Sequence, residues 1–242
     1  MLIVDELFSL PGGGKSTANA AVDRPGLVTR HEVTAAWTRC PRVQKTRTVA
    51  LGLARGRRIA AAARLAVAAS LVERESLARL VRLLVRAEWL SAQTGAALFD
   101  QGLLQGIWSI LLASGRTDVD PALLSPLLRS LYDGMKARIL YLEISPQEAA
   151  RRIVGRPNGH SRLDGRPADE VRRILERADR LPRSILAAAT LAGLEVTTLD
   201  GERPPAILAK EVRHWVDARP IQLGSRRGAE AAAAEPFHGR VF

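Results

Sequence analysis

Two kinds of hydrophobic pattern alternate along the chain. Short, nearly continuous apolar runs are typical of strands buried on both faces of a parallel sheet. Longer stretches repeat apolar residues every three or four positions, which is the spacing of an amphipathic helix. The runs that we interpret as strands are residues 2–8, 26–33, 96–100, 138–144 and 194–199.

The stretches with helical spacing carry recognisable start signals. Asp120 before Pro121 is a favourable N-cap followed by proline at the first helical position. The sequence Ser145-Pro146-Gln147-Glu148 combines the same proline placement with a capping box. Helices are therefore predicted at residues 16–22, 47–93, 102–114, 121–132, from 145 onward, 169–193 and 205–218. Pro182 is expected to kink or divide the helix at 169–193.

One part of the segment 47–93 has two distinct faces. Leu77, Leu80, Val81 and Leu84 form a predicted apolar face, and Arg79, Arg82 and Arg86 lie on the opposite, solvated face. Contact of these arginines with nucleic acid or anionic lipid is the alternative.

Strand and helix alternate, which predicts an α/β fold with a parallel sheet and right-handed crossovers. We expect one domain over residues 1–218, because a chain of this length can bury a sufficient core. Residues 219–242 contain an alanine run, scattered charge and little periodicity, which is typical of a disordered tail.

The composition narrows the classes of function. The net charge of +11 would suit a nucleic-acid partner, but the basic residues are spread along the chain, which makes such a partner less favoured. Cys40 is the only cysteine, so an intrachain disulfide and a zinc site built on thiolates are excluded. The four histidines show no metal-ligand spacing.

The first apolar run and the longest apolar stretches predict neither a signal peptide nor a membrane span. Asp5 and Glu6 interrupt the first apolar run, which no signal peptide allows, and the longest apolar stretches are shorter than the roughly 18 to 20 residues of a membrane span. We therefore expect a soluble, cytoplasmic protein without a membrane partner.

Residues 9–17 carry the most specific motif of the sequence. Ser9-Leu10-Pro11-Gly12-Gly13-Gly14-Lys15-Ser16-Thr17 matches the phosphate-binding loop G-x-x-x-x-G-K-[ST] except at Ser9, which replaces the first glycine. Glycines allow successive backbone N–H groups to point at phosphate oxygens, and the following helix adds its positive end. Lys15 would bridge the β- and γ-phosphates and Ser16 would ligate Mg²⁺. The predicted cofactor-binding residues are Pro11, Gly12, Gly13, Gly14, Lys15, Ser16 and Thr17, the alternative being a glycine-rich turn with an incidental lysine.

Three stretches together resemble the P-loop nucleotide kinases, particularly their thymidylate-kinase-like branch. They are ELFSLPGGGKST (6–17), ALFDQG (97–102), and ILYLEISPQEAARRIVGR with the following SRLDG and EVRRILERA (139–178). The resemblance covers residues 1–218. It implies a three-layer P-loop NTPase fold with about five parallel strands, and ATP and Mg²⁺ as cofactors. It also implies an acceptor site formed by the region after the second strand and the long helices, and a mobile lid at about 152–168.

Asp100 ends the third predicted strand, where open α/β sheets bind their ligands. An acid there could hold Mg²⁺ through water or accept the proton of an acceptor hydroxyl. The alternative is that Asp100 caps the helix that begins near Gly102. Related kinases often place an arginine after this acid, and Gln101 in its place puts thymidylate itself in question. Asp5 and Glu6 are further candidates for polar contacts near the site.

Arginines surround the polar loop at 156–167. Arg152 and Arg156 are four residues apart, so they share a helix face and could both reach a polyphosphate. Guanidinium groups bind phosphate as a planar fork, and phosphoryl transfer depends on such charge stabilisation. We predict Arg152, Arg156 and Arg162 as catalytic residues beside Lys15 and Asp100. The alternative is a solvated basic helix end.

Two weaker candidates follow other strands. Arg30, after the second strand, could hold an acceptor phosphate, and a surface position is equally compatible with the sequence. Arg203-Pro204-Pro205 lies where the family places its adenine-contacting loop.

The sequence as a whole predicts an Mg-ATP-dependent phosphotransferase acting on a nucleotide, a nucleoside or another small acceptor. A kinase for a sugar or metabolite and an ATP-binding regulator without catalysis are the rival hypotheses. The predicted partners are ATP and a small-molecule acceptor, and the long helical segment could pack against a copy of itself in a homodimer.

Overall fold

A computed structural model describes residues 1–22, 26–155 and 163–218, and within these ranges the chain forms five strands and eleven helices. The strands are β1 (Leu2–Phe8), β2 (Leu27–Thr29), β3 (Gly95–Phe99), β4 (Met135–Glu143) and β5 (Glu195–Asp200). The helices are α1 (Lys15–Ala20), α2 (Arg30–Arg39), α3 (Arg42–Ala54), α4 (Gly56–Ala68), α5 (Arg74–Ser91), α6 (Leu103–Ala113), α7 (Pro121–Leu131), α8 (Pro146–Val154), α9 (Ala168–Arg177), α10 (Arg180–Leu191) and α11 (Pro205–Asp217).

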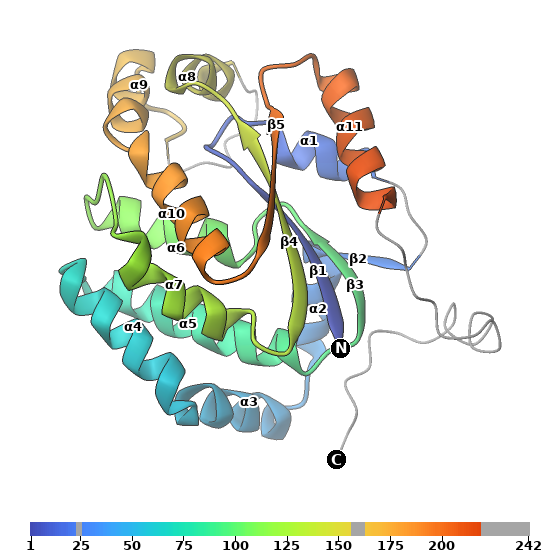
Figure 1. Cartoon of the computed structure of the whole chain (residues 1–242), viewed down its shortest axis with the longest axis vertical. Helices are drawn as coiled ribbons and strands as arrows, with labels where there is room; N and C mark the ends of the chain where they lie inside the picture. Colours follow the sequence, from blue (N-terminus) through green and yellow to red (C-terminus); the bar gives the residue numbers. More distant parts are fainter. Residues whose placement is uncertain (23–25, 156–162, 219–242) are drawn as a thin grey trace.

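All five strands belong to one parallel sheet in the order β2-β3-β1-β4-β5 (Figure 1). The predicted α/β class with a parallel sheet of about five strands is confirmed. Because β1 is the central strand, the loop that follows it lies at the middle of the carboxyl edge of the sheet, where such folds bind ligands.

Helices cover both faces of the sheet, which gives three layers (Figure 1). Helices α1 and α11 pack on one face, where Leu7 and Leu140 of the sheet meet Ala18, Leu208 and Val212. The opposite face carries a larger core, because α5, α6, α7 and α10 all contribute to it.

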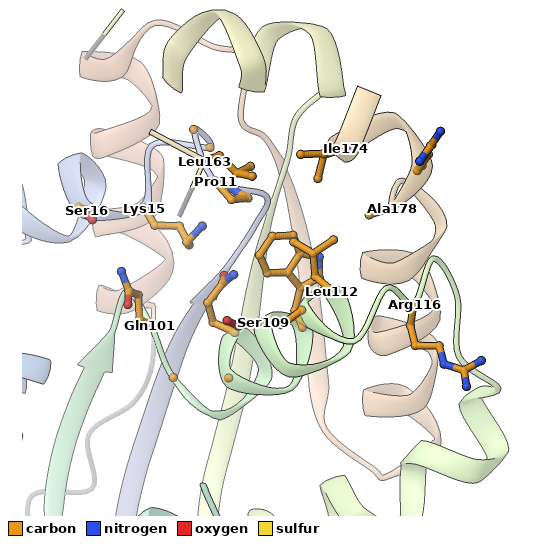
Figure 2. Close-up of a pocket in the computed structure, with 18 of the residues that line it drawn as sticks. Pro11, Lys15, Ser16, Gln101, Ser109, Leu112, Arg116, Leu163, Ile174 and Ala178 are labelled. Atoms are coloured by element: carbon orange, nitrogen blue, oxygen red, sulfur yellow. The ribbon is translucent and has the colours of Figure 1, made fainter. Parts of the chain in front are cut away.

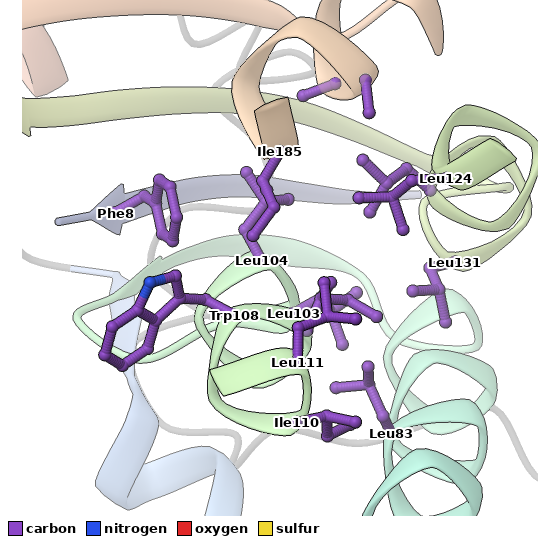
Figure 3. Close-up of a cluster of buried hydrophobic side chains, with 14 of the residues drawn as sticks. Phe8, Leu83, Leu103, Leu104, Trp108, Ile110, Leu111, Leu124, Leu131 and Ile185 are labelled. Carbon is purple, nitrogen blue, oxygen red and sulfur yellow. The ribbon is translucent and has the colours of Figure 1, made fainter. Parts of the chain in front are cut away.

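The larger core places helix α6 directly against β1. Phe8 of β1 lies near Leu104 and Trp108 of α6, and Leu103 and Leu111 face the helices beyond (Figure 3). Most of these side chains are completely buried. This packing fixes the position of α6, whose other face borders a cavity beside the loop that follows β1.

The second strand is shorter than predicted. Residues 26–33 were expected to form a strand, but β2 ends at Thr29 and α2 begins at Arg30. The reason is a complete capping box, in which Thr29 accepts the Glu32 N–H and the Glu32 carboxylate accepts the Thr29 N–H.

The helical segment 47–93 is divided into α3, α4 and α5. The predicted apolar face of α5 is only partly correct, because Leu77 and Val81 are 40% and 43% exposed whereas Leu80 and Leu84 are buried. Arg79 and Arg82 pair with Glu75 on the outer surface, as a solvated face requires. Arg86 does not lie on a solvated face, because it is only partly exposed and its guanidinium lies over the Phe99 ring.

Two predicted helix starts are confirmed with differences in detail. Asp120 caps α7 by accepting the Ala122 N–H. Ser145 accepts the Glu148 N–H, but the Ser145 N–H is bound by Glu202 instead of Glu148, so the predicted capping box is only half formed.

The helix predicted at 169–193 is divided as expected, but the division falls before Pro182. Helix α9 ends at Arg177 and α10 begins at Arg180, which leaves Pro182 in the first turn of α10, where its missing N–H costs nothing.

Among the helices of the described residues, none combines the length and the apolar character that crossing a membrane requires. The predicted tail (219–242) and the centre of the predicted lid (156–162) lie outside the described residues.

Candidate functional site

The loop between β1 and α1 has the backbone conformation that its glycines permit. Gly12 and Gly14 have φ angles of 93° and 81°, in the left-handed region that favours glycine. Lys15 begins the helix that follows. The strand before the loop and the helix after it, which we expected of a phosphate-binding loop, are both present.

Ser9 is integrated into the structure at the position where the motif has glycine. Its hydroxyl donates to the Leu142 carbonyl on the neighbouring strand β4 at 2.6 Å, and the side chain is buried. A Cβ atom on Gly13 would lie 1.8 Å from the Ser9 hydroxyl. Ser9 therefore occupies space that any side chain at position 13 would need.

Lys15 lies against the loop that precedes it. Its ammonium donates to the carbonyl groups of Ser9 at 2.9 Å and Leu10 at 3.0 Å. The lysine is thus held at the loop, between Ser16 and Pro11 in the view of Figure 2.

Ser16 and Asp100, the two predicted metal ligands, are in direct contact. The Ser16 hydroxyl donates to Asp100 Oδ2 at 2.9 Å. The two residues are 84 positions apart, and they meet because β1 and β3 are parallel neighbours whose carboxyl ends share one edge. The alternative role of Asp100 as the cap of α6 is wrong, since the N-cap residue Gly102 has no side-chain cap and another carboxylate binds the helix start.

Glu6 is that other carboxylate. It is completely buried and accepts the backbone N–H groups of Leu103, Leu104 and Gln105 at 2.8–3.2 Å, together with the Tyr132 hydroxyl at 2.5 Å. Burial raises the pKa of Glu6, and the hydrogen bond from Tyr132 is the largest opposing effect. Four donors fill the acceptor sites of a carboxylate, so this network suits the ionised form. Glu6 thus holds the start of α6 against β1.

Asp5 points to the other side of the sheet. Its two carboxylate oxygens each accept a hydrogen bond from the Arg138 guanidinium at 3.0 Å, and that guanidinium also lies 4.3 Å from the centre of the Trp215 ring. This buried pair joins the sheet to α11 and does not reach the loop cavity.

A cavity of about 700 Å³ opens on one side of the loop. Residues from β1–α1, α2, α5, α6 and α9 line it, and Figure 2 shows Lys15, Gln101, Ser109 and Leu112 facing it together with Ile174 and Ala178. The wall is mixed, with apolar side chains from α6 and α9 and several arginines: Arg30, Arg86, Arg116, Arg166 and Arg177. We call this space the loop cavity.

Arg30 and Arg86 enter the loop cavity from α2 and α5. Arg30, which the sequence proposed as an acceptor contact, is one of the residues that line this cavity. Arg86 lies with its guanidinium 5.5 Å from the centre of the Phe99 ring. Burial lowers the pKa of Arg86, the charge of Glu6 raises it, and the charge of Arg30 lowers it further.

A second cavity of about 430 Å³ borders the other side of the loop. It shares Gly12 and Gly14 with the loop cavity and is closed by side chains of α8 and of the connection from β5 to α11. Arg203, Pro204 and Pro205, the predicted adenine-contacting residues, line it together with Thr17 and Arg152.

Arg152 lines the second cavity and not the loop cavity. Its guanidinium donates to Glu148 at 2.6 Å and to the carbonyl groups of Gly201 and Glu202 at 2.8 and 3.1 Å. The arginine thereby ties α8 to the segment before α11. Arg156 and Arg162, the other two predicted catalytic arginines, lie outside the described residues.

Comparison with protein-family models gives no match for this chain, and neither does comparison with curated proteins. In the part of the chain that the structure describes, no group of three or more His, Cys, Asp or Glu side chains could hold a metal ion.

A polar stripe on α6 is a sequence feature from which the loop cavity could have been predicted. Helix α6 is mostly apolar, but Gln101, Gln105 and Ser109 recur at intervals of four and form one polar stripe at its start and along its side. That stripe lines the cavity. Arg86 has no comparable signal, because its spacing places it among solvated arginines.

Proposed function

We propose that this protein is an Mg-ATP-dependent phosphotransferase that acts on a small acceptor. One observation carries the proposal: Lys15, Ser16 and Asp100 converge at a glycine loop that separates two cavities. A phosphotransferase needs this arrangement, because donor and acceptor must meet from opposite sides of the phosphate-binding residues.

The loop fits a polyphosphate for reasons of shape and charge. Gly12 and Gly14 adopt backbone angles that side chains disfavour, and three successive glycines carry no side chain that would keep a ligand away from the backbone N–H groups. Lys15 adds a cation at the loop, and the N–H groups at the start of α1 add partial positive charge.

The hydroxyl of Ser16 and the carboxylate of Asp100 fit a hard divalent cation. Both supply the oxygen ligands that Mg²⁺ prefers, and Mg²⁺ usually takes only one or two such ligands from the protein. When bound, Mg-ATP supplies the phosphoryl group and part of the charge compensation. Lys15 would stabilise the negative charge at the loop, and Asp100 is also placed to hold the proton of an acceptor hydroxyl.

The second cavity is the proposed location of the adenine base. Pro204, Pro205 and Leu208 offer apolar contacts beside the loop, and the aliphatic stems and planar guanidinium groups of Arg152 and Arg203 can cover a flat ring. The loop cavity then remains for the acceptor.

The test is a screen for ADP release with Mg-ATP and three acceptor pools: nucleoside monophosphates, nucleosides, and sugars. We expect one pool to stimulate release, and Lys15→Ala to lower that rate by at least about 100-fold, as the removal of a main charge-stabilising group does. Lys210→Ala, which removes an exposed lysine of α11, is the matched control and should behave as wild type. Mg-ATP binding without stimulated release in any pool would favour a regulator over an enzyme.

Cellular context and assembly are proposed on the same basis. A Mg-ATP-dependent enzyme with a single cysteine suits the reducing, ATP-rich cytoplasm. A homodimer formed through α3–α5 is proposed from the length of that helical segment, and light scattering on the purified chain measures it directly.

A further inference from the structure

Arg86 is an unusual arginine because it is only partly exposed and has no charged partner in contact. Its neighbours Val85 and Ala87 are buried, and its guanidinium packs on Phe99. Across the described residues, that guanidinium has neither an ion pair within 4 Å nor a hydrogen bond, although a guanidinium has five N–H donors. The donors that remain border the loop cavity.

A second cation faces the same space. Arg30 lines the loop cavity from the start of α2, and its charge disfavours the charged form of Arg86. Two guanidinium groups that repel each other near an apolar wall are stabilised when an anion lies between them. The charge of Glu6 compensates part of this positive charge. The Glu6 carboxylate, however, already accepts four hydrogen bonds, from three N–H groups at the start of α6 and from the Tyr132 hydroxyl.

Two residues of α6 that line the loop cavity also carry a buried polar atom without a hydrogen-bond partner among the described residues. The two atoms are the side-chain oxygen of Gln105 and the indole nitrogen of Trp108. Buried polar groups are nearly always hydrogen-bonded, so a ligand or ordered water at this cavity is expected to supply partners for the two atoms.

We propose that the loop cavity binds an anionic acceptor, with a phosphate or carboxylate group on Arg86 and Arg30 and a polar body on Gln105 and Trp108. This assignment rests on the proposed function, in which the loop cavity is the acceptor side. It explains how the chain compensates for Gln101: the cation that related kinases place after the strand-end acid comes here from α5.

The experiment uses the full-length chain saturated with Mg-ADP, so that the loop is filled and only the acceptor side is measured. Calorimetric titrations compare nucleoside monophosphates with the corresponding nucleosides, and benzoate, a simple carboxylate, with the neutral benzamide. We expect one of the two anionic classes to bind, and its neutral counterpart to bind at least tenfold more weakly, as the loss of a charge-assisted hydrogen bond implies. Binding of the monophosphates would indicate a phosphate acceptor, and binding of benzoate would indicate a carboxylate acceptor.

Arg86→Met should lower the affinity for the anionic probe at least about tenfold and leave Mg-ADP affinity unchanged. Arg82→Met, one turn earlier on the exposed side of α5, is the matched control and should change neither affinity. Gln105→Leu should weaken the anionic and the neutral probe alike. If Arg86→Met does not fold, Arg86→Lys and Arg30→Met take its place, and lysine should recover only part of the affinity because it lacks the planar fork.

Three results would overturn the assignment. They are equal binding of charged and neutral probes, binding of no anionic probe, and unchanged anion affinity in the Arg86 variants. A loss of affinity for a non-hydrolysable Mg-ATP analogue in Arg86→Met, without a loss for the acceptor probes, would place Arg86 on the nucleotide instead. Failure of the proposed function itself shows separately, as wild-type protein that does not bind Mg-ADP.

Discussion

At the scale of single residues, the serine at position 9 of the loop between β1 and α1 restricts which residue can stand at position 13. The hydroxyl of Ser9 bonds to Leu142 and fills the space beside Gly13. The loop therefore depends on glycine at position 13 for lack of space, whereas Gly12 and Gly14 are required by their backbone angles. These are two different physical reasons for adjacent glycines.

This coupling predicts a non-additive pair of substitutions. Gly13→Ala alone should destabilise the protein by about 1–3 kcal/mol, the usual cost of overpacking, because its Cβ collides with Ser9. Ser9→Gly alone should cost about 1 kcal/mol through the lost hydrogen bond. In the Ser9→Gly background, Gly13→Ala should cost less than about 1 kcal/mol, since the nearest remaining atom is the Leu10 carbonyl oxygen at 3.2 Å. Urea denaturation of the four proteins measures the coupling, and additive costs would contradict it.

At the scale of elements, Glu6 is the contact that positions helix α6. One carboxylate on β1 binds three N–H groups at the start of the helix, and Tyr132, which follows α7, supplies the fourth donor. The residues thus fixed include the polar stripe that lines the loop cavity. A shift of α6 would move Gln105 and Ser109 relative to the loop.

The ionised state of Glu6 leads to a clear ranking of variants. Glu6→Gln replaces one acceptor oxygen by a donor that faces backbone N–H groups, so it should destabilise the fold by about 2–4 kcal/mol. Tyr132→Phe removes only one of four donors and should cost about 1 kcal/mol. Thermal unfolding of both variants gives the comparison. A Glu6→Gln protein as stable as wild type would show that Glu6 is neutral, because glutamine mimics a protonated carboxyl.

Helix α8 is linked to the segment before α11 by a pH-sensitive contact. Hydrogen bonds from Arg151 and Arg152 lower the pKa of Glu148 to about 2, and Arg152 continues to the carbonyl groups of Gly201 and Glu202. A carboxyl with a lowered folded-state pKa stabilises the fold above its ordinary pKa of 4.5, and this contribution is lost as the pH falls toward 2.

Glu148→Gln should therefore lower the melting temperature at pH 6 and have a smaller effect at pH 3. Arg151→Met should show the same trend, because Arg151 contributes the largest part of the shift. Melting curves between pH 3 and pH 6 check both variants. A difference from wild type that stays constant over this range would contradict the assignment.

At the scale of the whole molecule, the fold followed from the sequence wherever a local rule decides the outcome. The apolar run of β1, the glycine loop and the capped starts of α7 and α8 depend on residues close in the chain, and their placement was predicted. The end of β2 was not predicted. The apolar and β-branched residues up to Val33 favour a longer strand, whereas the capping box of Thr29 and Glu32 starts a helix at Arg30.

The meeting of residues at the candidate site was predictable in part for the same reason. Lys15, Ser16 and Asp100 follow from a motif and from the parallel order of β1 and β3. Arg86 could not be found, because its burial depends on how α5 packs over Phe99, and periodicity on one helix does not contain that contact. Arg152 donates to the backbone carbonyl groups of Gly201 and Glu202, about 50 residues away in the chain, and the spacing of residues on α8 cannot predict such a contact.

The central claim is that residues 9–17 bind the polyphosphate of a nucleotide. The most direct test is calorimetric titration of the full-length chain with Mg-ADP, with Lys15→Ala and Lys210→Ala as variants. We expect one binding site per chain, a loss of affinity of at least about tenfold in Lys15→Ala as for the removal of a charge-assisted contact, and no change in Lys210→Ala. A wild-type chain that binds no Mg-ADP, or a Lys15→Ala variant that binds it as tightly as wild type, would contradict the account.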